Sequence, residues 1–316
     1  MPRLALPLAG LLLLSGAIAA QEPRLQLRRP FRSGIEVTSV NVTVLDGDGR
    51  LAQGLGREDF EVFEDGEPQS ITQFVGERVP VSLGVVLDTS DSMFGTRIAD
   101  ARAALDRFLF ALLDRDDEFF VLAFNHAPHL LTEWTADPDV VRPALDGLRP
   151  SGATAAYDAV MAALPLFERR HRPRAALVVV SDGADTASDA TVRDVKNALL
   201  RSEAFVYAIA VDAKASKAIN TRVNPAALRA VTDQSGGRTE VVMTTADLEG
   251  ATARIADELR HQYLIGYTST HGADGRYHSI RVRVRREGYK VRARNGYVAH
   301  RRARPRQGPP TEVPPR

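Results

Sequence analysis

The stretch that decides the fold is VSLGVVLDTSDS, residues 81–92, in which an apolar run ends in a cluster of oxygen-bearing side chains. The run at 81–87 is apolar at nearly every position, which is typical of a strand buried on both faces of a parallel sheet. The polar residues follow at the carboxyl end of this strand, where open α/β sheets bind their ligands. The stretch therefore predicts an α/β sheet with a functional site at its strand ends.

Two later segments carry the same kinds of side chain. One is the loop Gly152-Ala153-Thr154, and the other is Ser181-Asp182-Gly183, which directly follows the apolar run AALVVV at 175–180. We expect the three segments to meet, because the carboxyl ends of parallel strands share one edge of the sheet. The oxygen donors predicted to converge there belong to Asp88, Ser90, Ser92, Thr154 and Asp182.

These five residues, called the cation site below, offer two carboxylates and three hydroxyls. Such hard oxygen ligands suit Mg²⁺, Mn²⁺ or Ca²⁺ rather than zinc or copper. Mg²⁺ is octahedral, so these ligands would leave one position open for a carboxylate from another protein. The sequence thus predicts a divalent cation, with Mg²⁺ favoured, and a protein partner that offers a Glu or Asp side chain.

Three further residues are expected beside the cation site. Asp91 lies inside the first segment, and two interpretations stay open for it, a partner of the ligands or an exposed side chain. Asp158 is predicted to hydrogen-bond loop backbone near the site or to cap its own helix, and Gly183 directly follows Asp182. Farther along, Asp189 is predicted to be the N-cap of the next helix.

Residues 80–261 alternate between strand and helix patterns, which predicts a doubly wound, mostly parallel sheet. Strands are expected at 81–87, 118–125, 129–134, 174–181, 204–211 and 240–243. Helices are expected at 97–113, 138–148, 155–167, 189–201, 225–232 and 246–260.

The flanking segments, residues 34–79 and 262–298, consist of short strand patterns separated by Asp-Gly turns. Residues 278–285 alternate apolar and basic side chains, so one face is predicted to be buried. We expect the two segments to pair with each other in one small antiparallel β module, which would join the ends of the α/β domain. Residues 299–316 are rich in Arg and Pro and are predicted to be disordered.

The N-terminus predicts export. Residues 1–20 combine a short basic start, an apolar stretch and small residues before a cleavage point, which is typical of a secretory signal peptide; an uncleaved membrane anchor is the alternative. No later segment is long and apolar enough to cross a membrane, so the mature protein is expected to be secreted or periplasmic. The chain has no cysteine, which excludes thiol catalysis and zinc–thiolate sites. Its net charge of +1 and lack of a nucleic-acid motif predict no nucleic-acid partner.

The pattern Asp88-x-Ser90-x-Ser92, with Thr154 and Asp182-Gly183, resembles the metal-ion-dependent adhesion site of von Willebrand factor type A domains. In that family the two serines and the threonine bind the cation, and the two aspartates bind it directly or through water. The resemblance covers about residues 80–260 and implies an adhesion or scaffolding role. The flanks, with Asp65-Gly66 upstream and Asn295-Gly296-Tyr297 downstream, resemble a bacterial exported group of the acidobacterial "VWFA-related" type.

Two other functions remain as alternatives to a binding module. A Mg²⁺-dependent hydrolase of the aspartyl-phosphatase type also places an Asp after a buried strand, but it needs a second Asp as general acid where Ser90 stands. The other alternative is a structural protein in which the metal only stabilises the strand ends. Asp88, Ser90 and Ser92 could also be only turn and N-cap residues. That interpretation would require three separate loops to carry ligand-type side chains at strand ends by coincidence. No enzyme is expected, because Ser90 stands where the general acid is needed and the sequence has no other catalytic motif.

Four acids in two turns, Asp46, Asp48, Asp65 and Glu67, lack the spacing of a calcium-binding loop and are predicted to be turn residues. The remaining candidate metal ligands are the two histidines of His126-x-x-His129. No third ligand is evident in the sequence, so we predict that this pair holds no zinc.

Overall fold

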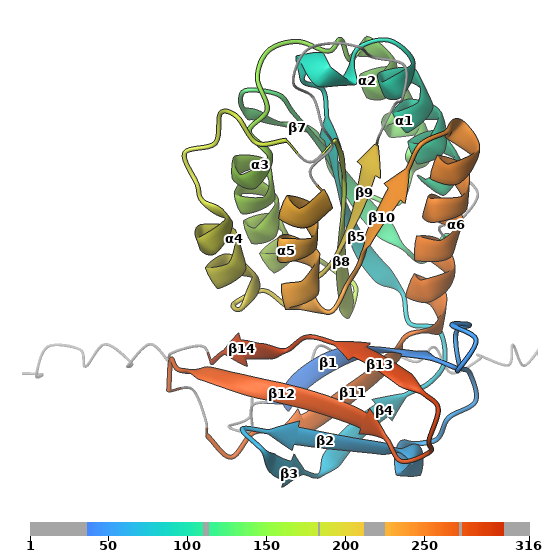
Figure 1. Ribbon diagram of the computed structural model, residues 1–316, viewed down its shortest axis with the longest axis vertical. Helices are drawn as coiled ribbons and strands as arrows, with labels where there is room; N and C mark the ends of the chain where they lie inside the picture. Colours follow the sequence, from blue (N-terminus) through green and yellow to red (C-terminus); the bar gives the residue numbers. More distant parts are fainter. Residues whose placement is uncertain (1–36, 110–113, 183, 212–224, 272–273, 300–316) are drawn as a thin grey trace, which may run out of the picture. The chain divides into compact units, whose positions relative to one another are not determined.

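The computed structural model describes residues 37–109, 114–182, 184–211, 225–271 and 274–299 (Figure 1). The predicted signal peptide, Gly183 and residues 300–316 of the expected tail lie outside these ranges. Ala299, the first residue of that tail, is buried, and its N–H donates to the carbonyl of Arg276 at 2.9 Å. No helix within the described ranges combines the length and apolar character that crossing a membrane requires.

The α/β domain is built on a six-stranded sheet in the order β10-β9-β8-β5-β6-β7. Its strands are β5 (Val81–Asp88), β6 (Glu118–Phe124), β7 (Pro128–Thr135), β8 (Arg174–Ser181), β9 (Phe205–Val211) and β10 (Thr239–Val242). All pair in parallel except β7, which is antiparallel to β6. Every residue of β5 is buried, as its apolar run predicts. The expected fold class, a doubly wound and mostly parallel sheet, is confirmed.

Helices cover both faces of this sheet (Figure 1). One face packs against α1 (Thr96–Arg107), α2 (Arg142–Gly147) and α6 (Thr245–His261). The other face packs against α3 (Ala156–Ala163), α4 (Val192–Leu199) and α5 (Pro225–Ser235). Alternate residues of β5 point into the two layers: Val85 lies in the first core and Val86 in the second. The strand ends are thus fixed from both sides.

Two predicted helices have different bounds because local chemistry competes with the apolar period. The helix expected at 189–201 begins after Thr191, not Asp189, because the Thr191 side chain accepts from the Asp194 N–H and Asp194 accepts from the Thr191 N–H. The prediction of Asp189 as N-cap is therefore wrong. The helix expected at 155–167 changes at Pro165 from α3 into a 3-10 helix, Leu164–Arg169.

A proline also divides the helix expected at 138–148. Pro138 opens a 3-10 helix, Pro138–Val140, and α2 follows separately with Pro143 in its first turn. The helix expected at 97–113 is an α-helix up to Arg107, and residues 110–113 lie outside the described ranges.

The flanks form two four-stranded sheets instead of the one expected. The first has the order β13-β1-β11-β4 and the second the order β14-β12-β2-β3. Their strands are β1 (Val37–Leu45), β2 (Phe60–Glu64), β3 (Glu67–Gln69), β4 (Ile71–Val75), β11 (Tyr263–Thr268), β12 (Tyr277–Val284), β13 (Lys290–Ala293) and β14 (Gly296–Val298). A 3-10 helix, Arg57–Asp59, precedes β2.

Each of these sheets combines strands from both ends of the chain, for example β1 with β11 and β2 with β12. The two sheets share one apolar core, in which Val40 and Ile265 of the first face Val62 and Val282 of the second. Two sheets form because every strand has one apolar face, and that face is buried only when a second layer covers it. We call this part the β-sandwich.

Candidate functional site

The carboxylate of Asp88 lies at the end of β5 and is fully buried. Its Oδ1 accepts a hydrogen bond from the Ser90 N–H at 2.8 Å, and its Oδ2 accepts one from the Ser181 hydroxyl at 2.6 Å. Ser181 is the last residue of the neighbouring strand β8. The carboxylate is therefore held in one orientation by two adjacent strand ends.

The two serines of the first segment lie side by side. Ser90 precedes a short 3-10 helix, Asp91–Met93, and that turn brings the Ser90 and Ser92 Oγ atoms to 2.9 Å from each other. Ser90 is buried and Ser92 is half-buried, while the Met93 side chain is completely buried beneath the turn. The turn thus presents two hydroxyls together, and Met93 anchors it to the core.

Thr154 reaches the same edge of the sheet from the loop before α3. Backbone hydrogen bonds link that loop to the first segment: the Asp91 N–H donates to the Gly152 carbonyl, and the Ser151 N–H donates to the Thr89 carbonyl, both at 2.9 Å. Gly152 has φ of 77°, a conformation that favours glycine. Thr154 itself is buried, and within the described residues its hydrogen bonds run through its backbone, leaving the hydroxyl available as a ligand.

Asp182 completes the set from the loop after β8, and it is also buried. Its Oδ1 accepts from the Ala184 N–H at 3.1 Å, and the Arg97 guanidinium lies 3.8 Å from its Oδ2. Arg97, in the first turn of α1, is only 5% exposed and also donates to the Ser92 carbonyl at 2.5 Å. This arginine was not predicted as part of the site, because nothing in the sequence around a charged residue in the first turn of a helix indicates that it is buried.

The electrostatics of the site are set by two buried carboxylates. Burial, together with a smaller effect of the Asp182 charge, raises the pKa of Asp88 to about 6, although hydrogen bonds from Ser181 and Ser90 act to lower it. A single arginine at 3.8 Å offsets part of this negative charge. The site therefore favours an added positive charge.

The donor set fits a small divalent cation. Octahedral Mg²⁺ has metal–oxygen bonds of about 2.0–2.1 Å, so neighbouring ligand oxygens lie about 2.9 Å apart. The Ser90 and Ser92 hydroxyl oxygens lie at that separation. Carboxylates of Asp88 and Asp182 supply hard anionic ligands beside them, which is the chemistry that Mg²⁺, Mn²⁺ or Ca²⁺ prefers.

The structure places the other predicted residues around this set. Asp91 is exposed on the surface of the turn, so its side chain does not lie between the ligands and the core. Asp158 accepts from the N–H groups of Asp189 and Ala190 at 3.0 and 2.9 Å, as one of its predicted roles requires. Asp185 accepts from the Tyr157 N–H at 2.9 Å. These acids hold the loop that follows Asp182.

One large apolar side chain is exposed close to the cation site. Phe94, two residues after Ser92, is 77% exposed. In contrast, the histidines of the other candidate, His126 and His129, have ring centroids 6.4 Å apart, and within the described residues no third ligand joins them.

Comparisons with known proteins agree with this architecture. The sequence model of the von Willebrand factor type A domain matches residues 83–184. A von Willebrand factor type A protein from Catenulispora acidiphila superposes with a TM-score of 0.51 at 13% identity, over 85% of this chain and 75% of that one. No curated protein matches the chain in sequence.

Two further solved structures resemble a smaller share of the chain. The conserved hypothetical protein BatB from Bacteroides thetaiotaomicron has a TM-score of 0.48 at 18% identity, over 56% of this chain and 98% of that one. The vWF domain of the type V pili tip protein Mfa5 from Porphyromonas gingivalis has a TM-score of 0.45 at 14% identity, over 57% and 95%. The matched residues 83–184 contain β5 from Leu83 onward, all of β8 and all five predicted ligands. Residues 83–184 therefore match the von Willebrand factor type A domain, and the fold of the chain is that of the Catenulispora von Willebrand factor type A protein.

Proposed function

We propose that the chain is an exported protein-binding module whose cation site captures a carboxylate of a partner protein. Domains of this family commonly take part in protein–protein adhesion, which is the starting point for the proposal. The observation that carries it is the pair of serine hydroxyls 2.9 Å apart beside two buried carboxylates, all at the carboxyl edge of the sheet.

The residues of the cation site have separate roles in this proposal. Asp88 and Asp182 provide the negative charge, and Ser90, Ser92 and Thr154 provide neutral oxygen ligands. When bound, Mg²⁺, Mn²⁺ or Ca²⁺ would supply a positive charge to which an acidic side chain of the partner is attracted. The hydrogen bonds to Asp88 and the linked loops keep these donors in place before any partner arrives.

The surroundings of the site suit a protein partner. Phe94 is exposed beside the site, and aromatic side chains often dominate the energy of protein interfaces. An apolar contact at Phe94 next to a charge-directed contact at the cation site would combine affinity with orientation. We infer a binding role instead of a catalytic one, because Ser90 stands where an aspartyl phosphatase needs its general acid.

Export is the second component of the proposal. It rests on the signal-peptide pattern of residues 1–20 and the absence of cysteine from the chain. A secreted or periplasmic location would expose the cation site to partners at the cell envelope. The resemblance of the flanks to a bacterial exported group supports the same location.

A pull-down from the native cell envelope tests the binding role. Wild-type protein is compared in Mg²⁺ and in excess EDTA, alongside Ser92→Ala and Asp182→Ala; Ser70→Ala, an exposed serine in the β-sandwich, is the matched control. We expect EDTA and both site variants to release a partner that Mg²⁺ restores to the wild type and to Ser70→Ala. Retention of every partner in excess EDTA would refute the proposal.

A further inference from the structure

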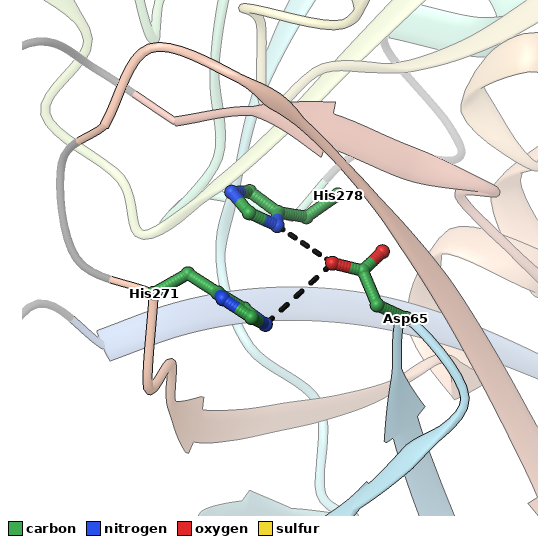
Figure 2. A group of neighbouring side chains, drawn as sticks. All are labelled: Asp65, His271 and His278. Carbon is green, nitrogen blue, oxygen red and sulfur yellow. Dashed lines mark hydrogen bonds and ion pairs between the residues drawn. The ribbon is translucent and has the colours of Figure 1, made fainter.

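A cluster of nitrogen and oxygen ligands lies in the β-sandwich, on the part of the chain outside the family match. It consists of Asp65, His271 and His278, whose ligand atoms all lie within 4.8 Å of one another. Figure 2 shows both histidine side chains directed toward the same oxygen of Asp65. His278 Nδ1 lies 2.8 Å from that Oδ2, and His271 Nε2 lies 3.5 Å from it.

The position of Asp65 is fixed by its turn. Asp65 and Gly66 connect β2 to β3, and both have positive φ, 51° and 90°, as in the two-residue hairpin turns that Asp-Gly favours. Asp65 Oδ1 accepts from the N–H and the hydroxyl of Ser279 at 2.8 and 3.1 Å. Ser279 thus occupies one carboxylate oxygen, and the other faces the two imidazoles.

A second carboxylate prepares His278 to act as a ligand. Asp274 Oδ1 lies 3.1 Å from His278 Nε2, on the opposite side of the ring from Asp65. A hydrogen bond from Nε2–H to Asp274 leaves Nδ1 as the ring nitrogen that a metal would bind, in place of the proton that Nδ1 directs at Asp65 in the metal-free protein. Histidines that bind metals usually donate their other ring N–H to a carboxylate or carbonyl in this way.

The cluster is closed on one side and open on the other. The His278 side chain is 5% exposed, whereas those of Asp65 and His271 are 37% and 40% exposed. The rings of His271 and His278 stack with centroids 4.5 Å apart, so the exposed His271 ring has to tilt for both lone pairs to meet at one point. An ion entering from solvent would thus meet Asp65 and His278 already in position, and His271 would move to complete the site.

We propose that Asp65, His271 and His278 form a zinc site in the β-sandwich, distinct from the cation site, with Asp274 positioning His278. Two imidazoles and a carboxylate suit zinc and related transition metals, whereas the oxygen-only cation site suits Mg²⁺. Three protein ligands leave a fourth tetrahedral position for water. The ion would fasten the segment after β11 to the β2–β3 turn. The same contacts without a metal would be an ion-pair network around a protonated His278.

Zinc binding by the full mature chain tests this site. In calorimetry, Zn²⁺ is titrated into the protein in a buffer with excess Mg²⁺, which fills the cation site. We expect one zinc to bind per chain. His271→Ala removes a direct ligand that is exposed, so the fold should survive. His126→Ala is the matched control, because it removes a histidine from a pair that lacks a third ligand within the described residues. We expect His271→Ala to abolish tight binding and His126→Ala to leave it unchanged.

A second variant tests the positioning role of Asp274. Asp274→Asn should weaken zinc binding by about 10- to 100-fold while keeping one zinc per chain, since this is the usual cost of losing a carboxylate behind a metal-bound histidine. Equal zinc affinity in wild type and His271→Ala would overturn the proposal and leave the ion-pair network. Loss of zinc in Asp88→Ala but not in His271→Ala would overturn it as well, because zinc would then occupy the cation site.

Discussion

At the residue scale, Asp88 shows how a buried acid can favour a ligand. Its carboxylate is inaccessible, and Asp182 raises its pKa further beyond what burial does. A folded protein without a cation therefore holds two carboxylates in an unfavourable arrangement that Arg97 offsets only in part. Burial of charge is costly unless it is paired, so an added divalent ion should stabilise the fold.

This arrangement predicts a Mg²⁺-dependent thermal shift. Saturating Mg²⁺ at about 100 times its dissociation constant should raise the free energy of unfolding by about 2.7 kcal/mol, because the ion binds only the folded state. Asp88→Asn should remove most of that increase while remaining folded. Thermal melts of both proteins with EDTA and with Mg²⁺ provide the measurement, and an equal shift in the variant would argue against Asp88 as a ligand.

Glu118, which is not part of the cation site, predicts how the stability of the fold depends on pH. Burial acts to raise its pKa, but hydrogen bonds from the Ser82 hydroxyl at 2.5 Å and the His171 N–H at 2.6 Å outweigh burial and lower the pKa. A carboxylate with a lowered folded-state pKa stabilises the protein above its unfolded pKa, and this contribution is lost as pH falls through the folded-state value.

We therefore expect Glu118→Gln to destabilise the fold near neutral pH by about 1.5–3 kcal/mol, the usual worth of hydrogen bonds to a charged group. The difference from wild type should shrink below about pH 4, near the ordinary Glu pKa. Urea unfolding at pH 7 and pH 3 measures it. Glu67→Gln, at an exposed position of β3, should show no such dependence.

At the scale of elements, apolar patterns predicted the central strands well and helix ends poorly. The runs before Asp88 and Asp182 are buried throughout because both faces of the sheet carry helices. Helix starts depend instead on single side-chain contacts: Thr191 rather than Asp189 caps α4, because Asp194 completes the reciprocal pair. The period of apolar residues carries no information about such contacts.

At the centre of the sheet, the stability of the fold is expected to depend strongly on the size of the side chain at position 84. A Cβ on Gly84 in β5 would lie 2.5 Å from the Phe120 ring and 2.8 Å from Leu177 Cδ1, so Gly84→Ala should destabilise the fold by about 1–3 kcal/mol. Gly250→Ala in α6 is the matched control. Its Cβ would meet only the flexible end of Arg254, and alanine favours a helix by about 1 kcal/mol. Opposite shifts in denaturant midpoint are expected.

At the scale of the whole molecule, the sequence predicted the β module but not how it attaches to the α/β domain. Glu258 of α6 is 1% exposed and accepts from the Thr43 hydroxyl of β1 at 3.0 Å and the Tyr207 hydroxyl of β9 at 2.9 Å. Arg292 of β13 pairs with the same carboxylate. Each polar residue looked like a surface position in the sequence, because the pairing of distant charges is not visible in a local pattern.

This buried network predicts that two Glu→Ala substitutions on α6 differ strongly in their cost to stability. Glu258→Ala should cost about 3–5 kcal/mol of stability, because it leaves a partly buried arginine and two hydroxyls without this partner. Glu249→Ala, also on α6, removes an exposed ion pair with Arg107 and should cost far less. Chemical unfolding compares them, and equal effects would show that the network adds no stability.

The adjacency of β4 and β11 has a mechanical consequence. The chain leaves the β-sandwich after Val75 and returns at Tyr263, and these strands are antiparallel neighbours with Leu264 opposite Val75. Tension applied between residues 37 and 299 is therefore carried by the β-sandwich, and the α/β insert stays out of the force path. In an optical trap, the β-sandwich should extend first. A load between these two residues would therefore leave the geometry of the cation site in the α/β insert unchanged.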